Sequence, residues 1–295
     1  MLQLGYGINQ RRIWTAETDR TGAIAETISR DKDLTKSLLQ ACGVPVPIGQ
    51  AVDSATEAWS VAQELGLPVV VKPSDGNHGR GVFTNLSTQQ EIEQAYGLAV
   101  QEGSGVLVER FILGQEHRLL VVGGKLIAAA KGEYAQVTGN GVSAIHTLID
   151  TQLNADPRRG HEEDQPLNYV RLDSAAQLEI ARQGYTPQTI LPNGEHAIIQ
   201  RNGNVAIDCT ELVHPEVAAL ACTAARVVGL DIAGIDLVAL DISKPLQQQG
   251  GAIVEVNAGP GLLMHLKPAA GKPRQVGRDI VAHSFALGDM ARVPV

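Results

Sequence analysis

Apolar residues in the first half of the chain follow two patterns, one typical of helices and one typical of strands. Residues 31–42 begin with an acidic turn, carry leucines at helical spacing and end before glycine and proline stop signals. Residues 54–66 show the same spacing, and Ser54 followed three residues later by Glu57 is typical of a helix N-terminus. Residues 88–103 are again helical in pattern. We therefore expect a helix in each of these stretches.

Short apolar runs separate these helical stretches. Residues 67–72 form one such run, a glycine-rich loop follows, and residues 82–86 form another, which predicts a strand, a loop and a strand. Residues 105–133 contain three further runs divided by turn residues and predict three consecutive strands. Strands and helices therefore interleave through the first half of the chain.

The pattern changes in the second half. From about residue 140 to residue 200 the sequence is polar and weakly periodic, and it is too long for a plain connection, so we expect a functional insertion there. Residues 215–230 predict an amphipathic helix, and residues 232–240 and 251–257 predict two strands. The fold class that these elements predict is α+β (α/β).

Composition limits the class of protein. The 295 residues include 44% hydrophobic and 19% charged residues, an ordinary globular composition that is long enough for two lobes. The formal net charge of −8 argues against a general electrostatic grip on nucleic acid or on an anionic membrane. The sequence has no 18-residue apolar run and does not start like a signal peptide, so we expect a cytoplasmic protein.

The cysteines and the chain ends add two smaller expectations. Cys42, Cys209 and Cys222 are widely spaced and form no CxxC pair, which favours free buried thiols over a metal site or a disulfide framework. Strand-like sequence begins at once, and "ARVPV" ends the chain without a polar tail. We therefore expect the chain to be cut from a longer polypeptide.

The stretch "IVEVNAGPG" places Glu255 and Asn257 within an apolar run, before a Gly-Pro-Gly break. Alternate residues of a strand share a face, so these two side chains point the same way while Val254 and Val256 pack into the interior. The polar face either looks into solvent or holds a hard cation such as Mg²⁺, because an unpaired buried carboxylate is costly. Asp236 lies on the preceding apolar strand, so three oxygen ligands converge if the two strands are neighbours.

Lys72 ends an apolar run, and Gly76, Gly79 and Gly81 follow it in a loop. Glycines let the backbone N–H groups of a loop turn toward an anion, so this arrangement indicates a phosphate cradle that closes as a lid over a triphosphate. The spacing matches neither the P-loop nor the dinucleotide-binding fingerprint. A plain hairpin loop with a lysine at its edge explains the same residues equally well.

A second candidate for nucleotide binding is the segment from Glu109 to Glu116, which holds Phe111 and Ile112 between its carboxylates. Such a linker can bind a purine ring through backbone groups and the ribose through a carboxylate. The alternative is a surface turn whose charged side chains are solvated.

Taken in chain order, these features resemble the ATP-grasp ligases, and the resemblance covers about residues 30–265. It implies an ATP-grasp fold of two α+β lobes with the nucleotide between them. Residues 1–30 would be an N-terminal linking segment, residues 31–110 the small lobe with the glycine-rich lid, and residues 111–295 the large lobe with the insertion.

The resemblance also implies roles for individual residues, with ATP and two Mg²⁺ ions as cofactors. Two lysines would contact the phosphates, the glycine loop would cover them, and the segment "VERFILGQE" would hold adenine and ribose. The residues assigned in this way are Lys32, Lys72, Gly76, His78, Gly79, Gly81, Glu109, Arg110, Ile112 and Glu116. The residues implied as magnesium ligands are Asp236, Glu255 and Asn257.

Longer stretches, among them "DGNHGRGV", "VGLDIAGIDL" and "EVNAGPGLLMHLKPAAGKPR", are similar to the central ATP-grasp module of the cyanophycin synthetases. That family builds a poly-aspartate backbone and attaches arginine to each aspartate side chain. The similarity implies that ATP activates the C-terminal carboxylate of a cyanophycin or poly-aspartate primer as an acyl phosphate, which the amino group of aspartate attacks. Relative to the family pattern, the chain lacks a substantial N-terminal region and the Mur-ligase-like module that would add arginine.

A reaction of this kind depends on positioning and charge neutralisation, so it requires no Ser or Cys nucleophile. We expect Arg201 to stabilise the phosphoryl oxygens and the tetrahedral intermediate, because a guanidinium binds phosphate as a bidentate fork. We assign Asn204 to the same catalytic group. Some related ligases carry an arginine two residues before the magnesium aspartate, where this chain has Gly234.

Five basic side chains could line a groove for an acidic substrate or could be solvated and packing residues, namely His117, Arg118, His265, Lys267 and Arg274. The expected partners are the primer, aspartate and the missing domains of the same polypeptide, with no nucleic acid and no membrane; a homo-oligomer stays open. Two alternative functions remain. One is another ATP-grasp acid–amine ligase, glutathione-synthetase-like or glutamate-adding, and the other is a nucleotide-binding module that is silent without its neighbours.

Overall fold

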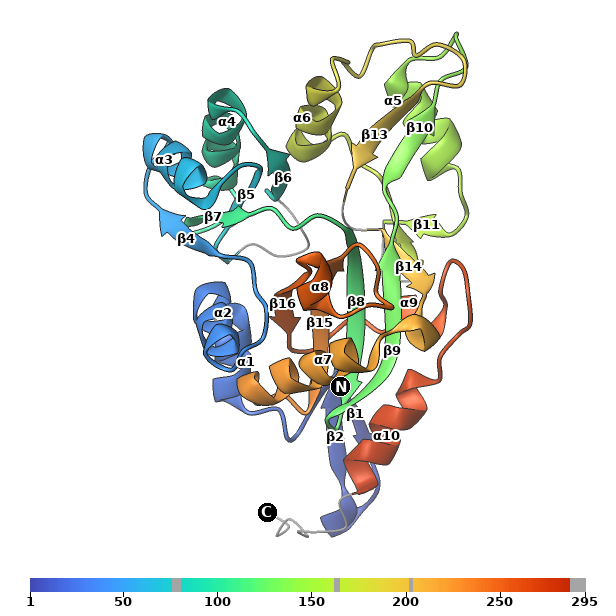
Figure 1. The fold of residues 1–295 in the computed structure, drawn as a ribbon. Coiled ribbons are helices and arrows are strands. Elements are labelled where there is room, and N and C mark those ends of the chain that lie inside the picture. Colours follow the sequence, from blue (N-terminus) through green and yellow to red (C-terminus); the bar gives the residue numbers. More distant parts are fainter. Residues whose placement is uncertain (76–80, 162–164, 202–203, 287–295) are drawn as a thin grey trace. The chain divides into compact units, whose positions relative to one another are not determined.

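The structure is a computed structural model that describes residues 1–75, 81–161, 165–201 and 204–286 (Figure 1). The chain divides into two compact units, each with its own sheet and core. Unit 1 comprises Met1–Val46, Ile112–Lys131 and Ala206–Val295. Unit 2 comprises Pro47–Phe111 and Gly132–Val205.

Unit 1 is built from N-terminal strands, a central sheet and the helices that pack on it. Its strands are β1 (Leu2–Leu4), β2 (Arg11–Trp14), β3 (Glu17–Thr18), β8 (Gln115–Val122), β9 (Lys125–Gly132), β14 (Val205–Asp208), β15 (Ile232–Ala239) and β16 (Ala252–Asn257). Its helices are α1 (Ala23–Arg30), α2 (Lys32–Ala41), α7 (Pro215–Val228), α8 (Leu246–Gln249), α9 (Leu263–Leu266) and α10 (Val276–Ala286), with short turns η1 (Gly7–Asn9) and η3 (Thr210–Leu212).

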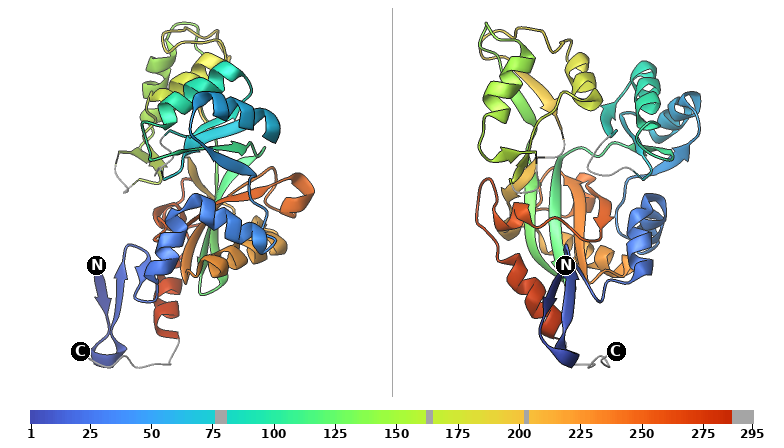
Figure 2. Two further views of the ribbon diagram at one scale, coloured as in Figure 1. Left: turned by 90° about the vertical axis from the view of Figure 1, so that its left-hand side faces the viewer. Right: turned by 180° about the vertical axis from the view of Figure 1, so that it is seen from behind.

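The central sheet of unit 1 has five strands in the order β14-β9-β8-β15-β16. Leu119, Ile235 and Leu237 on one face pack against α1, α2 and α7. The opposite face is apolar at one end, where Leu120 and Ile232 pack with α10 and the N-terminal segment. Figures 1 and 2 show the N-terminal strands beside α10. Beyond this apolar end, the same face carries the polar side chains from which the site is built.

Unit 2 is built from a four-stranded sheet with its helices and a second, smaller layer. Its strands are β4 (Gly49–Val52), β5 (Val69–Pro73), β6 (Phe83–Leu86), β7 (Val106–Arg110), β10 (Ala135–Thr138), β11 (Arg159–Gly160), β12 (Leu167–Asn168) and β13 (His196–Gln200). Its helices are α3 (Ala55–Leu65), α4 (Gln89–Ala99), α5 (Ile145–Leu148), the π-helix η2 (Ile149–Asn154) and α6 (Ser174–Arg182).

Two hydrophobic cores hold unit 2 together. The sheet β4-β7-β5-β6 packs one face, with Val69, Val71 and Val108, against α3 and α4. The antiparallel pair β10-β13 forms a second core with α5, η2 and α6. Leu178 of α6 belongs to the first core, so α6 contributes to both.

Most elements expected from the sequence are present. The predicted helices are confirmed as α2, α3, α4 and α7, and the predicted strands are confirmed as β5 to β9, β15 and β16. The Ser54 hydroxyl caps α3 by accepting from the N–H of Glu57 at 3.1 Å, as predicted. The fold class α+β (α/β) is also confirmed. None of the helices in the described ranges is both long enough and apolar enough to cross a membrane.

The boundaries of the two compact units differ from the boundaries predicted for the small lobe, 31–110, and the large lobe, 111–295. Residues 132–205, which contain the predicted insertion, fall in the same unit as residues 47–111. The physical basis is the packing of α6, whose Leu178 enters the core of the four-stranded sheet. The insertion is folded, and its described residues between 140 and 200 form three helices and three strands.

Candidate functional site

Three charged side chains lie side by side across the sheet of unit 1. Arg118 of β8 is paired with Asp236 of β15, and Asp236 is paired with Glu255 of β16. Residues directly opposite one another in a sheet share a face, so the three form one row. Asp236 is only 3% exposed. The strands of Asp236 and Glu255 are therefore neighbours. The predicted convergence of their carboxylates required this arrangement.

Arg118 is the hydrogen-bonded partner of Asp236. Its Nε donates to Oδ1 at 2.7 Å, and a second guanidinium nitrogen donates to Oδ2. Burial raises the pKa of Asp236 above its ordinary value; the charge of Arg118 opposes this rise, and the charges of Glu255 and Glu116 add to it. The charge of Asp236 in turn raises the pKa of Arg118. Arg118 thus supplies the counterion of a buried carboxylate through a two-point contact.

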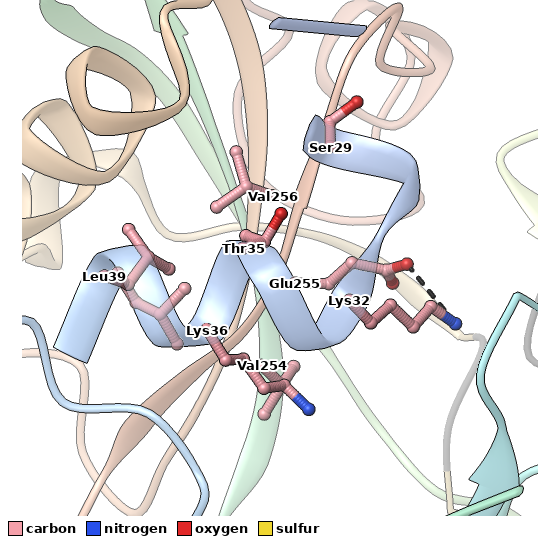
Figure 3. A pocket seen from close by; sticks show the side chains of 9 residues that line it. Ser29, Lys32, Thr35, Lys36, Leu39, Val254, Glu255 and Val256 are labelled. Atoms are coloured by element: carbon pink, nitrogen blue, oxygen red, sulfur yellow. Dashed lines mark ion pairs between the residues drawn. The ribbon is translucent and has the colours of Figure 1, made fainter. Parts of the chain in front are cut away.

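Lys32 places a second cation beside the row. It is the first residue of α2, and Asp31 caps that helix by accepting from the N–H of Leu34 at 3.0 Å. From this position Nζ lies 3.6 Å from Oε1 of Glu255 (Figure 3). The pocket drawn there is lined by Ser29, Lys32, Thr35, Lys36, Leu39, Ile253, Val254, Glu255 and Val256. Lys32 and Glu255, which the sequence assigned to phosphate and metal, therefore meet.

A β-bulge interrupts β16 next to Glu255. Asp236 pairs with Glu255, whereas the next residue of β15 pairs with Ile253. Val254 is left without a partner, is half-buried and lines the pocket beside α2. The prediction that Val254 packs into the interior is therefore wrong, because strict alternation does not hold across a bulge.

The Gly-Pro-Gly break explains why Gly234 stands where some related ligases carry arginine. Gly234 is paired with Asn257 at the end of β16. Gly259 has a φ angle of 58°, which turns the chain back, and Pro260 then packs over Gly234. A Cβ atom on Gly234 would lie 2.7 Å from the Cβ atom of Pro260. No larger side chain fits at this position unless the loop moves.

Asp236, Glu255 and Asn257 fit a site for Mg²⁺. The two carboxylates are directly opposite on neighbouring strands, and Asn257 follows two residues after Glu255 on the same strand. Mg²⁺ is usually held by one or two carboxylates, with water and substrate phosphates as its other ligands. In the described part of the chain no three His, Cys, Asp or Glu side chains gather into a metal site. An ion held here would therefore take its remaining ligands from water or substrate.

A second pair of predicted binding residues meets on the sheet of unit 2. Val71 and Val108 pack against α3 and α4, so their neighbours Lys72 and Glu109 lie on the opposite face. Lys72 Nζ and Glu109 Oε2 are 2.9 Å apart, and both side chains are buried. Gly49 of β4 faces Glu109, and a Cβ atom on it would lie 2.5 Å from the Glu109 Cγ atom. The glycine therefore leaves the room that Glu109 occupies.

Other residues predicted to bind nucleotide lie at the end of β7, in the link that follows it and at the start of β8. Arg110 donates to the carbonyl of Leu65 at 3.1 and 2.8 Å, a contact that supports the C-terminal end of α3. Ile112 is half-buried in the link between the strands. Glu116 begins the polar face of β8, with its Oε1 atom 3.9 Å from the guanidinium of Arg118. Binding roles for Arg110, Ile112 and Glu116 stay predictions.

The predicted lid is described only at its end. Gly81 has a φ angle of 67°, and a Cβ atom on it would lie 3.1 Å from side-chain atoms of Pro73 and Glu102. The backbone conformation at this position therefore favours glycine, and a Cβ atom would also require the neighbouring side chains to shift slightly. The lid residues Gly76, His78 and Gly79 lie outside the described residues.

The two residues assigned to catalysis, Arg201 and Asn204, follow β13 in unit 2. Arg201 donates to Oε1 of Glu179 at 2.8 Å and lies over the ring of Tyr134, 5.3 Å from its centroid. Burial lowers the pKa of Arg201, but its contacts with Glu179 and Tyr134 together raise the pKa by more. Asn204 accepts from Arg159 at 2.6 Å, and its buried amide nitrogen has no partner among the described residues. Their catalytic role stays a prediction.

Of the five basic residues considered for a substrate groove, the two histidines are buried. His117 lies on the core face of β8, where Nδ1 is 2.8 Å from the carbonyl of Gln115. Burial lowers the pKa of His117 to about 4. Burial, aided by the charge of Arg118, also lowers the pKa of His265 to about 4. Both histidines are therefore neutral at pH 7 and contribute no positive charge to a groove.

Arg274 is held by an acidic partner of its own. Two of its guanidinium nitrogens donate to the two oxygens of Asp208 at 3.0 and 2.6 Å. Burial raises the pKa of Asp208, but hydrogen bonds from Arg274 and Thr210 outweigh it and lower the pKa to about 2. Lys267 is exposed. Arg118 is thus the member of the five that the structure joins to the row of Asp236 and Glu255.

Known proteins share both sequence and fold with this chain. Residues 31–123 match the family described as carbamoyl-phosphate synthase L chain, ATP binding domain. A cyanophycin synthetase of Geminocystis herdmanii is 42% identical over 303 residues, a match to the whole chain and to 35% of that protein. A bifunctional glutathione synthetase of Pasteurella multocida is 26% identical, with a TM-score of 0.61 over 96% of the chain and 40% of that protein. The ATP-grasp ligase PsnB shares the fold at 14% identity, with a TM-score of 0.51 over 90% of the chain and 62% of PsnB.

The chain has the ATP-grasp fold, and its sequence is similar to the cyanophycin synthetases over its whole length. The ATP-grasp fold predicted from the sequence and the resemblance to the cyanophycin synthetase module are thereby confirmed. This ATP-grasp chain spans about a third of the length of the cyanophycin synthetases that it matches, with 33% of the Trichormus variabilis enzyme covered. The relatives cited here are named synthetases, and PsnB, which shares the fold, is named an ATP-grasp ligase.

Gly234→Ala tests the packing beneath Pro260. The added methyl group requires space that Pro260 fills, so we expect the free energy of unfolding to fall by about 1–3 kcal/mol, the usual cost of overpacking. Urea unfolding measures this change. Gly277→Ala is the control, because a Cβ atom on Gly277 would meet nothing within 4 Å. Equal stability of the two variants would contradict the packing described here.

The buried pair in unit 2 can be tested by removing one charge or both. Lys72→Met takes the cation away from buried Glu109, and we expect a loss of about 3–5 kcal/mol in the free energy of unfolding. The double variant Lys72→Met with Glu109→Leu removes both charges and should recover most of that loss. If the double variant is as unstable as the sum of the two single variants, the charges are not coupled.

Proposed function

We propose that this ATP-grasp ligase extends a poly-aspartate chain, joining the C-terminal carboxylate of a cyanophycin or poly-aspartate primer to the amino group of aspartate. The observation that carries the reaction type is the row of Arg118, Asp236 and Glu255, where carboxylates and cations gather on one sheet face. The choice of substrate is supported by the similarity to cyanophycin synthetases along the whole chain, at 40–42% identity.

The proposed reaction has two steps. An oxygen of the primer carboxylate bonds to the γ-phosphorus of ATP, and the bond from that phosphorus to the bridging oxygen breaks, which yields an acyl phosphate and ADP. The amine nitrogen of aspartate then bonds to the acyl carbon, phosphate leaves, and the nitrogen releases a proton. The protein forms no covalent bond, so its residues act by binding and orienting the reactants.

Charge neutralisation is the first task of the side chains. Asp236, Glu255 and Asn257 would hold Mg²⁺, which when bound neutralises charge on the phosphate oxygens. Lys32 would contact the phosphates from the start of α2, where it already lies beside Glu255. Lys72 would contribute a second positive charge to the phosphates. The site for the triphosphate would therefore consist of four charged side chains and one amide, namely Asp236, Glu255, Lys32, Lys72 and Asn257.

Orientation is the second task. The segment from Glu109 to Glu116 would hold the adenine and ribose. Arg201 and Asn204 would bind the oxygens of the phosphoryl group in transfer, and Glu179 and Arg159 keep these two side chains in place through hydrogen bonds. A guanidinium is suited to this task because its donors match two phosphate oxygens at once.

A second candidate function is another acid–amine ligation on the same fold. It is favoured by the likeness to a bifunctional glutathione synthetase over 96% of the chain. In that case the same groups would serve ATP, and the acid and the amino acid would differ. A third candidate is a module that binds nucleotide but is silent alone, since the chain spans only about a third of its cyanophycin synthetase relatives.

The proposed function can be tested with ATP, Mg²⁺, aspartate and a short cyanophycin-like or poly-aspartate primer. We expect mass spectrometry to show primers lengthened by aspartate, with one ADP released per residue added. Extension with glutamate but not with aspartate would favour the second candidate. Saturable binding of Mg-ATP by calorimetry without ADP release under any condition would favour the silent module.

Glu255→Gln tests the metal assignment within this function. The amide keeps the shape of the side chain but removes a charge from the place where phosphate oxygens would gather, so we expect ADP release to fall by about two orders of magnitude or more. Glu255 is only partly buried, so the melting temperature should change little. Glu211→Gln is the control, because Glu211 is an exposed partner of Lys272 on the same unit. Normal turnover of Glu255→Gln would remove Glu255 from the site.

A further inference from the structure

Both carboxylates that the proposed function assigns to Mg²⁺ already have a basic side chain beside them. Arg118 donates to both oxygens of Asp236, at 2.7 Å for the contact between Nε and Oδ1. The Nζ atom of Lys32 lies 3.6 Å from Oε1 of Glu255. The negative charge of the row is therefore balanced by the protein's own cations.

A divalent cation and Arg118 require the same two atoms. Asp236 is buried, and each of its carboxylate oxygens accepts a hydrogen bond from the guanidinium. A metal ion bonded to either oxygen would lie next to that guanidinium. Two positive groups at such short range repel strongly where little water screens them. Full occupation of Asp236 by both cations is therefore unfavourable.

We propose that Arg118 is the resident counterion of Asp236, and that a divalent cation entering the site displaces it, so that Arg118 sets the metal affinity of this ligase. The inference rests on the proposed function in one respect, the assignment of Asp236 as a metal ligand. It adds a role for Arg118 that is independent of which acid and which amine are joined.

The surroundings of Arg118 permit this exchange. The side chain of Arg118 is 30% exposed, against 4% for that of Asp236, so the arginine is the more accessible partner of the two. On the side away from Asp236, Arg118 is paired with Ala130 of β9, whose side chain is a single methyl group. Glu116 lies on the same strand face with an oxygen 3.9 Å from the guanidinium. A displaced Arg118 can therefore keep a carboxylate nearby.

The proposed exchange means that Arg118 has opposite effects on the stability of the metal-free protein and on the affinity for the metal. With no metal bound, Arg118 stabilises the fold, because buried Asp236 would otherwise carry an uncompensated charge. With metal bound, the ion takes over that task. Removing Arg118 should therefore destabilise the metal-free protein and, at the same time, make metal binding tighter.

The test compares Arg118→Met with the parent and with Arg274→Met, using Mn²⁺ without nucleotide as the probe. Arg274 is the matched control because it also donates to both oxygens of one aspartate, Asp208, on the same unit. Loss of the electron paramagnetic resonance signal of free Mn²⁺ reports binding, and melting temperatures are recorded in EDTA and in Mn²⁺. We expect Arg118→Met to bind Mn²⁺ about fivefold or more tightly than the parent, as for coupled sites.

The melting temperatures provide a second readout. In EDTA both arginine variants should melt below the parent. Mn²⁺ should reduce the difference between Arg118→Met and the parent, while the difference between Arg274→Met and the parent should stay the same. Unchanged or weaker Mn²⁺ binding by Arg118→Met would overturn the proposal, and weaker binding would mean that Arg118 orients Asp236 for the metal. If Arg118→Met does not fold, Arg118→Lys keeps one charge and should bind Mn²⁺ more tightly than the parent.

Asp236→Asn separates the failure of this inference from the failure of the metal assignment. If Mn²⁺ binding is lost in Asp236→Asn but unchanged in Arg118→Met, Asp236 is a ligand and only the displacement of Arg118 is refuted. If Mn²⁺ binding is the same in Asp236→Asn as in the parent, or if no variant binds Mn²⁺, the metal assignment fails and the inference fails with it. Lost binding in Asp236→Asn together with tighter binding in Arg118→Met supports both.

Discussion

A carboxylate buried in the middle of a sheet must have a cation beside it, and this requirement organises unit 1. Desolvation of an unpaired carboxylate costs several kcal/mol, so the register of β8 against β15 has to bring Arg118 to Asp236. The antiparallel pairing on the other side of β15 then brings Glu255 to the same row. The same strand alignment has two consequences. It balances the charges of the row when no metal is bound, and it places two carboxylates where they could hold a metal ion.

The smaller sheet of unit 2 also pairs a buried carboxylate with a cation. One face packs valines against α3 and α4, and the opposite face holds the buried pair of Lys72 and Glu109. Gly49 makes the space for Glu109, as Gly234 makes the space for Pro260 in unit 1. In each unit the charged side chains of interest lie on the sheet face away from its main helices, and a glycine in the sheet leaves room for a neighbouring residue, Glu109 in unit 2 and Pro260 in unit 1.

The sequence predicted helices α2, α3, α4 and α7, strands β5 to β9, β15 and β16, and the meeting of Asp236 with Glu255. It could do so because apolar runs with a single polar residue identify buried strands. It could not predict the β-bulge at Val254, since an extra residue in a strand leaves no mark on composition. The contact between Arg118 and Asp236 joins residues far apart in sequence and depends on strand register, which periodicity does not specify. The available signal was the spacing of Glu116 and Arg118, which puts both on one strand face. Glu179 is the partner of Arg201 because of the way α6 packs. No local sequence pattern indicates this packing.

The most direct test of this account is a crystal structure of the protein with Mn²⁺ and a non-hydrolysable ATP analogue, in which anomalous scattering locates the metal. The account predicts a peak in contact with the carboxylates of Asp236 and Glu255, with the guanidinium of Arg118 no longer bonded to both oxygens of Asp236. A bound analogue with its metal elsewhere, and with Arg118 still bonded to both oxygens of Asp236, would contradict it.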